Sequence, residues 1–265
     1  MRWFGTAVAL HEKEAVMRLY GFLKKDVRLH EGLKACMNCG VCTAICPAAE
    51  FFEYDPRMIA VEVQSRDDER IKKLLQSDTI WYCGQCMSCK TRCPRGNCPG
   101  LIINALRKLS QELGYFTESR RGRQQYALKK VLIANILNKG YCIHPESVKP
   151  ELHPEQGPVW KWVQEHRKDV YQRLGARLDQ EGPGTLRKID PSVLSELSAI
   201  FDESGATEFL AKIESASKKK AKEMGFAGTD EGMERYFMHV YTSQDESELF
   251  QISKHEKTGQ GKDLG

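Results

Sequence analysis

The sequence predicts an all-α protein, because apolar residues recur at helical spacing along most of the chain and no strand-like alternation surrounds its cysteines. A second observation is a repeated run of four cysteines followed by proline, which holds eight of the ten cysteines. The third is a length of 265 residues, which allows one or two domains. We therefore expect a helical core around the two cysteine runs, followed by additional helices and an extended C-terminal arm.

The N-terminal segment, residues 1–30, is expected to contain one helix over residues 11–30. Its apolar residues recur near positions i, i+3, i+4 and i+7, and they are Ala15, Val16, Leu19, Phe22 and Leu23. Charged residues occupy the positions between them, as on the solvent face of an amphipathic helix. We expect this helix to pack beside the cysteine-rich domain.

The cysteine-rich domain, residues 31–115, contains helices with recognisable starts. Asp55-Pro56 predicts an N-cap followed by a proline in the first turn. Asp67-Asp68-Glu69 places acidic residues at the positive end of a second helix, so two helices are expected between the cysteine runs. A third helix is predicted from Pro99 to Gly114, with the glycine as its C-terminal stop.

The C-terminal extension, residues 116–225, is predicted to be helical apart from one stretch. Residues 140–158 contain four prolines and should form an irregular strap. Helices are expected around it, over residues 118–138, 159–178, 190–201 and 207–225. The last segment, residues 226–265, shows no sustained hydrophobic period, so we expect an irregular C-terminal arm that only a partner would order.

The two cysteine runs carry the chemistry. Each has the spacing C-x2-C-x2-C-x3-C-P, the ligand pattern of bacterial-type ferredoxins with two [4Fe–4S] clusters. Three thiolates at i, i+3 and i+6 can surround one corner of a cluster, and the fourth cysteine of each run ligates the other cluster. The pattern assigns cluster 1 to Cys36, Cys39, Cys42 and Cys93, and cluster 2 to Cys83, Cys86, Cys89 and Cys46. The chain is thus predicted to carry electrons on two [4Fe–4S] clusters.

Other uses of the cysteines fit this spacing less well. Structural zinc sites use separated pairs of ligands, and disulfide frameworks are typical of short secreted chains. Cys98 and Cys142 lie outside the runs, and we expect both to pack as small buried hydrophobic residues. A contact of Cys98 with the cluster that Cys93 ligates is the alternative. No catalytic residue is predicted, since the chain has no adjacent cysteine pair and no G-x-G-x-x-G motif.

Composition excludes several classes of protein. Charged residues make up 29% of the chain, and its apolar stretches are far shorter than the ~20 residues of a transmembrane helix. The net charge of +4 is cancelled by two oxidised clusters of about −2 each, so no nucleic-acid partner is expected. The N-terminus has no convincing cleavage site, and ten cysteines indicate a reducing cytoplasm.

The two runs, the helical insertion between them and Cys93-Pro94-Arg95-Gly96 resemble the C subunit of heterodisulfide reductase. The resemblance covers residues 30–115 and implies a helical ferredoxin fold. It also implies that the chain relays electrons between a flavin-containing A-type subunit and a catalytic B-type subunit. The longer C-terminal half looks like that of the soluble C-type subunits of heterodisulfide-reductase-like complexes in sulfur oxidisers, which implies a role in sulfur metabolism.

Three other functions remain open on the sequence alone. A free-standing dicluster ferredoxin could shuttle electrons between enzymes, although it would need little more than the cluster domain. The chain could instead be the iron–sulfur subunit of another cytoplasmic oxidoreductase complex. A redox or iron sensor would need a regulatory output domain, and none is visible. Half of the chain follows the cluster domain, and its aromatic residues Trp160, Trp162, Tyr236 and Phe237 are candidates for partner contacts.

Overall fold

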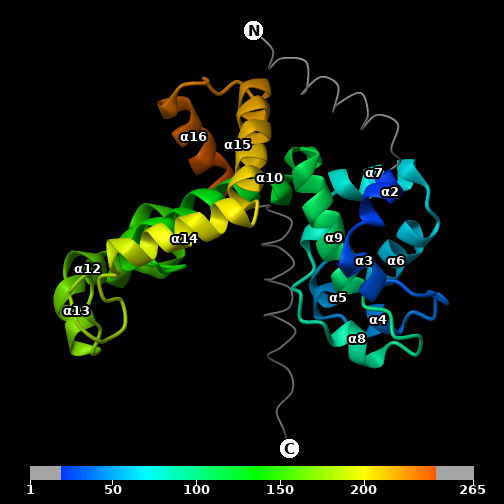
Figure 1. The fold of residues 1–265 in the computed structure, drawn as a ribbon, viewed down its shortest axis with the longest axis horizontal. Coiled ribbons are helices and arrows are strands. Elements are labelled where there is room, and N and C mark those ends of the chain that lie inside the picture. Colours follow the sequence, from blue (N-terminus) through cyan, green and yellow to red (C-terminus); the bar gives the residue numbers. More distant parts are fainter. Residues whose placement is uncertain (1–18, 243–265) are drawn as a thin grey trace, which may run out of the picture. The chain divides into compact units, whose positions relative to one another are not determined.

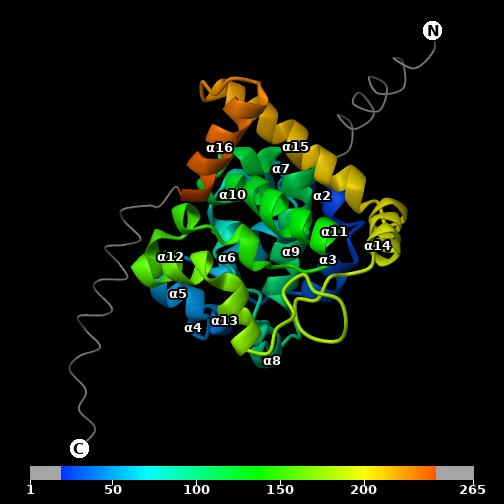
Figure 2. The ribbon, with the colours of Figure 1, turned by 90° about the vertical axis from the view of Figure 1, so that its left-hand side faces the viewer.

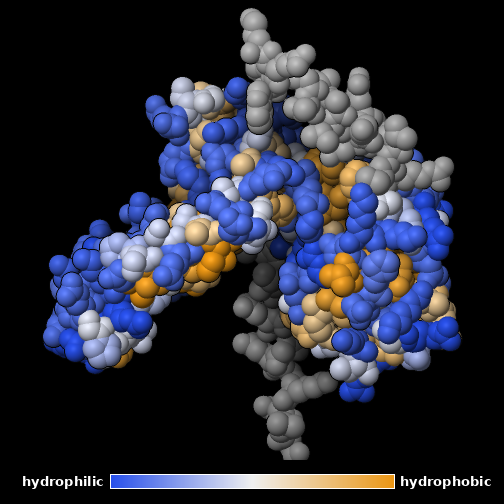
Figure 3. Space-filling model, viewed as in Figure 1, coloured by the Kyte–Doolittle hydropathy of each residue, from blue (hydrophilic) through white to orange (hydrophobic). Residues whose placement is uncertain are grey.

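The structure, a computed structural model, describes residues 19–242, and it contains no strand in this range (Figure 1). The all-α prediction is therefore confirmed. The described residues divide into two compact units, residues 19–122 and residues 123–242. Polar side chains cover most of the visible surface of each unit (Figure 3). Among the described residues, no helix has both the length and the apolar composition needed to cross a membrane.

The first unit is a bundle of short helices around one longer helix. Its helices are α2 (Leu19–Leu23), α3 (Val27–Gly32), α4 (Val41–Ala44), α5 (Pro47–Phe51), α6 (Pro56–Gln64), α7 (Asp68–Gln76), α8 (Ser88–Arg92) and α9 (Pro99–Glu112). The longer helix, α9, contacts α2, α3, α6, α7 and α8. Its side chains Ile102, Ile103 and Leu106 are buried with residues of α2, α3, α6 and α7 in one core. The helices that surround the cysteine runs are thus held in place through α9.

Local capping explains the helices between the cysteine runs. Asp55 accepts hydrogen bonds from the backbone N–H groups of Arg57 and Met58, at the start of α6. Asp67 caps α7 in the same way. Both predicted helices and the helix after Pro99 are therefore confirmed.

The expected single helix over residues 11–30 is wrong in its described part. The chain turns at residues 24–26, between α2 and α3, and Asp26 accepts a hydrogen bond from Arg28 N–H as the N-cap of α3. Aspartate at this position favours a new helix start over continuation. Residues 11–18 lie outside the described residues.

The second unit contains the helical extension. Residues 120–139 form α10 (Arg120–Leu128), a π-helical turn (Lys129–Ile133) and α11 (Ala134–Lys139), which ends at Gly140 with a φ of +73°. Then follow α12 (Gly157–Glu165), α13 (Arg167–Arg173), α14 (Pro191–Glu203), α15 (Ala206–Glu223) and α16 (Asp230–Thr242). Residues 140–156 contain only three short 3₁₀ turns, each starting at a proline.

The C-terminal arm is the main departure from the sequence prediction. Residues 230–242 form α16, which contacts α15 (Figures 1 and 2). Met233, Tyr236, Phe237 and Val240 are buried on one side of this helix. Their spacing is i, i+3, i+4 and i+7, so a helical period is present and the irregular arm is wrong over this range. Tyr236 and Phe237 therefore serve the core of the second unit, while residues 243–265 lie outside the described residues.

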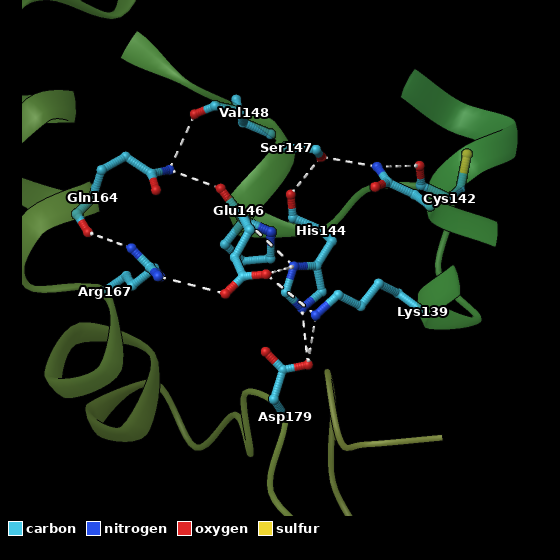
Figure 4. Close-up of polar contacts among 11 residues, drawn as sticks. Lys139, Cys142, His144, Glu146, Ser147, Val148, Gln164, Arg167 and Asp179 are labelled. Carbon is cyan, nitrogen blue, oxygen red and sulfur yellow. Dashed lines mark hydrogen bonds and ion pairs between the residues drawn. The ribbon is translucent and has the colours of Figure 1, made fainter. Parts of the chain in front are cut away.

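A network of charged side chains ties the strap to the rest of the second unit (Figure 4). Lys139 Nζ lies 3.2 Å from Glu146 Oε2 and 3.3 Å from Asp179 Oδ1. Arg167 contacts the other oxygen of Glu146, and buried His144 lies with its Nε2 3.5 Å from Asp179 Oδ1. His144, Glu146 and Asp179 have the donor atoms of a metal site. Two cations already neutralise the two carboxylates, so the group is better described as an ion-pair network.

This network makes stability depend on pH. The hydrogen bond from Lys139 holds the pKa of Glu146 below its ordinary value of 4.5. A carboxylate with a lowered folded pKa stabilises the fold above its unfolded pKa and loses this effect as the pH falls through the folded pKa. We expect Lys139→Met to lower the stability of the second unit by up to about 1 kcal/mol near pH 7, since the pair is partly exposed.

Thermal unfolding followed by tryptophan fluorescence at several pH values checks this expectation. The difference between the wild type and Lys139→Met should shrink below about pH 4.5, where Glu146 is protonated in the unfolded chain. Lys212→Met is the control, because it removes a more exposed pair with Glu208. A difference that stays constant down to acid pH would contradict the role of Glu146.

Candidate metal centres

The two cysteine runs have the same backbone path. The third residues, Asn38 and Gln85, have φ angles of 58° and 55°. The fifth residues, Gly40 and Met87, have φ angles of 81° and 58°. Left-handed residues at these two places curl each loop, so that its first three cysteines can surround a common point. Each loop then enters a short helix, α4 or α8, and these two helices contact each other.

All eight cysteines of the runs are free thiols. Cys39 and Cys86, the second cysteines of their runs, are exposed, and the other six are partly buried. Burial raises the pKa of Cys42, and it raises the pKa of Cys89 to about 12. These thiols hold their protons at neutral pH until a metal ion displaces them, because metal binding requires the thiolate.

A cavity of about 260 Å³ lies between the two runs. Cys83, Cys86 and Cys89 of the second run line it together with Cys46 of the first run. Cys42 also reaches its wall, and the remaining lining is largely apolar or aromatic. A largely apolar cavity lined by four thiols has the ligand chemistry that a [4Fe–4S] cluster requires. The residues present therefore fit such a cluster at this place.

Asn97 links the second run to the start of the first. Its Oδ1 accepts a hydrogen bond from Lys34 N–H at 2.6 Å, and its Nδ2 donates to Ala35 C=O at 3.3 Å. The same Nδ2 lies 3.7 Å from Cys93 Sγ. Because residues 34–35 lead directly into Cys36, this buried amide holds the sulfur of Cys93 beside the first run.

A close approach of α3 and α9 supports the same junction. Cys98 N–H donates to Gly32 C=O at 2.7 Å. A Cβ atom on Gly32 would come within 3.0 Å of backbone atoms of Cys98 and Ile102. Glycine allows this contact without a shift of the neighbouring backbone, and the contact places the segment before Cys36 next to the segment after Cys93.

The first cysteines of the two runs are held by different side chains. Gln64 accepts a hydrogen bond from Cys36 N–H at 2.7 Å and donates to Cys36 C=O at 3.2 Å. Arg107 donates to Cys83 C=O at 2.8 Å and to Ile80 C=O at 2.7 Å. A neutral amide thus anchors the first run, and a cation anchors the second.

Tyr54 is the fourth polar side chain near the cysteines. It lines the cavity, and its buried hydroxyl has no hydrogen-bond partner among the described residues. Burial raises the pKa of Tyr54, and the neighbouring sulfurs of Cys83 and Cys46 act in the same direction. The phenol therefore keeps its proton and remains a hydrogen-bond donor.

Sequence reasoning missed four of these polar residues, namely Tyr54, Gln64, Asn97 and Arg107. Each is a polar side chain beside a cysteine run or on a helix that packs against one. Asn97 was the most accessible from sequence, because it lies between the ligand Cys93 and the helix start at Pro99. The others contact the runs only through the packing of α6 and α9 or through the cavity wall.

The expectation for the two remaining cysteines is confirmed for one and wrong for the other. Cys98 is buried, as expected, and its sulfur lies 3.6 Å from Met87 Sδ and close to Cys89, so it borders the second run. The alternative was a contact of Cys98 with the cluster that Cys93 ligates. Cys98 lies instead beside Cys89, which is assigned to the other cluster. Cys142 is exposed, and the expectation that it is a buried hydrophobic residue is wrong.

Comparison with known proteins agrees with the cavity chemistry. A protein family described as a 4Fe-4S dicluster domain matches residues 32–97. This range contains all eight cysteines of the two runs. Two [4Fe–4S] clusters are therefore the cofactors of the first unit.

Characterised relatives point to one group of proteins. The C subunit of the ferredoxin:CoB-CoM heterodisulfide reductase of Methanosarcina acetivorans is 40% identical over 124 residues, 43% of this chain and 49% of the relative. An iron–sulfur C subunit of the CoB–CoM heterodisulfide reductase of Methanocaldococcus jannaschii is 34% identical over 99 residues, 37% of this chain and 51% of the relative. A protein of Archaeoglobus profundus that is described as like the C subunit of heterodisulfide reductase is 37% identical over 84 residues, 31% of this chain and 43% of the relative. The chain spans about half the length of these relatives.

The junction at Asn97 gives a testable prediction. Asn97→Ala removes two part-buried hydrogen bonds, those with Lys34 N–H and Ala35 C=O, which should lower the stability of the first unit by about 2 kcal/mol. The [4Fe–4S] cluster nearest Cys36 should then be lost faster under air. Iron release and paramagnetic resonance measure this loss.

Asn135→Ala is the matched control for this prediction. Asn135 lies in the second unit and its amide donates to Ser147 Oγ at 2.8 Å and to Cys142 C=O at 3.4 Å. Its loss removes similar hydrogen bonds and should leave both clusters as stable as in the wild type. Equal iron release from the two variants would show that Asn97 has no special relation to the cysteine runs.

Proposed function

Since the dicluster part of this chain belongs to the family of heterodisulfide reductase C subunits, we propose that the chain is the electron relay of a heterodisulfide-reductase-like complex. Cluster 1 would be held by Cys36, Cys39, Cys42 and Cys93, and cluster 2 by Cys83, Cys86, Cys89 and Cys46. Electrons would pass between a flavin-containing A-type subunit and a catalytic B-type subunit. The proposal includes a role in sulfur metabolism and a location in the cytoplasm.

One observation supports the crossed ligation in this proposal. Cys46 lines the same cavity as Cys83, Cys86 and Cys89, although 37 residues separate it from the nearest of them in sequence. Proline after Cys46 starts α5, and α5 carries the chain away from the first run. The contact of Asn97 with Cys93 and with residues 34–35 supports the reciprocal arrangement for cluster 1.

The clusters supply one-electron oxidation and reduction when bound, and the chain's own residues determine where they sit. α4 and α8 contact each other, so the two loops are held side by side. Cys39 and Cys86 are exposed, so each would hold its cluster close to the protein surface. Two adjacent clusters, each close to the surface, suit a relay with one entrance and one exit.

The crossed ligation predicts an unusual pattern of damage. Cys46→Ser should impair the cluster held by Cys83, Cys86 and Cys89, and Cys93→Ser should impair the cluster held by the first run. The intact protein should contain about eight irons and eight sulfides, as two clusters require. Iron analysis and paramagnetic resonance of anaerobically prepared protein measure both quantities.

Cys142→Ser is the control for this experiment, because Cys142 is an exposed thiol of the second unit. It should leave the iron content and both resonance signals unchanged. If each mutation instead damages only the cluster held by its own run, the crossed ligation is wrong. The assignment of two [4Fe–4S] clusters would still hold.

The relay function predicts that the chain acts only with partners. The isolated chain with both clusters should show no disulfide reduction at an enzymatic rate, since it has no nucleophile pair and no flavin-binding motif. Purification from the native host should recover it with a B-type and an A-type subunit. The protein with two oxidised clusters is nearly neutral, so the association should change little between low and moderate salt.

Recovery of the chain without such partners, or full turnover by the chain alone, would contradict the relay function. A free electron shuttle would exchange electrons with several enzymes and form no stable complex. Gel filtration of the native extract, followed by identification of the chains that elute together, separates these outcomes.

A further inference from the structure

The surroundings of the two cysteine runs differ in charge although their backbones match. On the second run, the guanidinium of Arg107 binds Cys83 C=O, and its carbon centre lies 5.4 Å from the ring centroid of Trp81. Arg107 is partly buried, and none of the ion pairs among the described residues includes it. On the first run, the neutral Gln64 occupies the corresponding place at Cys36.

Cations near the first run are compensated or exposed. Arg57 pairs with Asp55 at 2.7 Å, so the two charges cancel near Cys42. Lys34 is exposed, and water screens its charge. Burial makes the uncompensated charge of Arg107 more effective, because the low dielectric of the interior strengthens its field.

Hydrogen-bond donors are also distributed unequally. Tyr54 lines the cavity of Cys83 and Cys46, and its buried hydroxyl makes no geometrically defined hydrogen bond among the described residues, while the sulfur of Cys83 is its nearest acceptor. The hydroxyl near Cys42 is that of Thr43, which donates to Asp55 and also lies beside the sulfur of Cys42, as Ser88 lies beside the sulfur of Cys86. Cluster 1 would receive the amide of Asn97 through its assigned ligand Cys93, but at 3.7 Å from Cys93 Sγ this contact is long. The second run also receives Gln85 N–H at 3.4 Å from Cys83 Sγ.

We propose that Tyr54 donates a hydrogen bond to a sulfur of the cluster at Cys83, Cys86 and Cys89, and that Tyr54 and Arg107 together make this cluster the more easily reduced of the two. Reduction adds one negative charge to a cluster. Hydrogen bonds to its sulfurs and a nearby cation stabilise that charge, so both raise the reduction potential. Tyr54 and Arg107 are positioning residues that tune the cluster and ligate no iron.

This inference rests on the proposed function and adds a direction to it. The first electron that enters the chain settles on cluster 2. Electron flow within the chain is therefore downhill from the cluster at Cys36, Cys39 and Cys42 to the cluster at Cys83, Cys86 and Cys89. The partner that accepts electrons should then dock near exposed Cys86, and the donor near exposed Cys39.

Redox titration of the complete chain with both clusters, followed by paramagnetic resonance, tests the inference. In Tyr54→Phe the cluster that is reduced first in the wild type should become harder to reduce. A loss of one hydrogen bond to a charged group corresponds to about tenfold in the equilibrium, which for a one-electron couple is about 59 mV. Arg107→Gln should shift the same cluster in the same direction, because it copies the neutral Gln64 of the first run.

Tyr236→Phe is the matched control. Tyr236 also has a fully buried hydroxyl without a partner among the described residues, but it lies in the second unit, away from both cysteine runs along the chain. In Tyr236→Phe, the reduction potentials of both clusters should equal those of the wild type. Iron and sulfide analysis of each variant shows that both clusters are present before titration.

Several results would overturn the inference. They are unchanged potentials in both variants with full iron content, or a shift of the cluster that is reduced second. If Tyr54→Phe fails to hold its clusters, the potentials of Arg107→Gln alone test the inference. This variant should keep its structure, because the glutamine can still donate to the backbone carbonyl groups. The outcome is independent of the crossed ligation, since Tyr54 and Arg107 both lie at Cys83, and Cys46→Ser tests that ligation separately.

Discussion

A four-iron cluster needs four thiolates, and one tight loop supplies only three of them. The rest of the first unit follows from this constraint. Each loop must be curled, which the left-handed residues at Asn38, Gly40, Gln85 and Met87 achieve. Each loop must also meet a cysteine from a distant part of the chain. That second requirement is met by helix packing, because the two runs are separated by α5, α6 and α7.

The central helix α9 joins the two requirements. It begins six residues after Cys93, and its first turn packs so closely on Gly32 that a side chain there would push it outward. Asn97, just before that turn, bonds to the two residues that precede Cys36. Further along α9, Arg107 reaches back to Cys83. One helix thus positions the start of both cysteine loops, and its apolar face forms the core that keeps it there.

The two cysteine loops have nearly the same backbone, but the side chains around them differ. Matching backbone angles and matching exposure of Cys39 and Cys86 would make two equivalent clusters. Gln64 and Arg107 break this equivalence with one neutral and one charged anchor. A relay benefits from such a difference, because an electron moves spontaneously only toward the cluster with the higher potential. The direction of flow is then a property of side chains that ligate no iron.

The sequence by itself determined the cofactors and most helices of the first unit. Cysteine spacing is set by cluster geometry, and the caps at Asp55 and Asp67 act over two or three residues, so both are readable locally. The break at Asp26, the ordered helix α16 and the exposed Cys142 were not foreseen, because burial depends on distant neighbours. The roles of Tyr54, Gln64, Asn97 and Arg107 were likewise decided only by the tertiary structure. Their contacts join residues 24 to 63 positions apart or face a cavity that exists only after folding, and no local pattern encodes such a meeting.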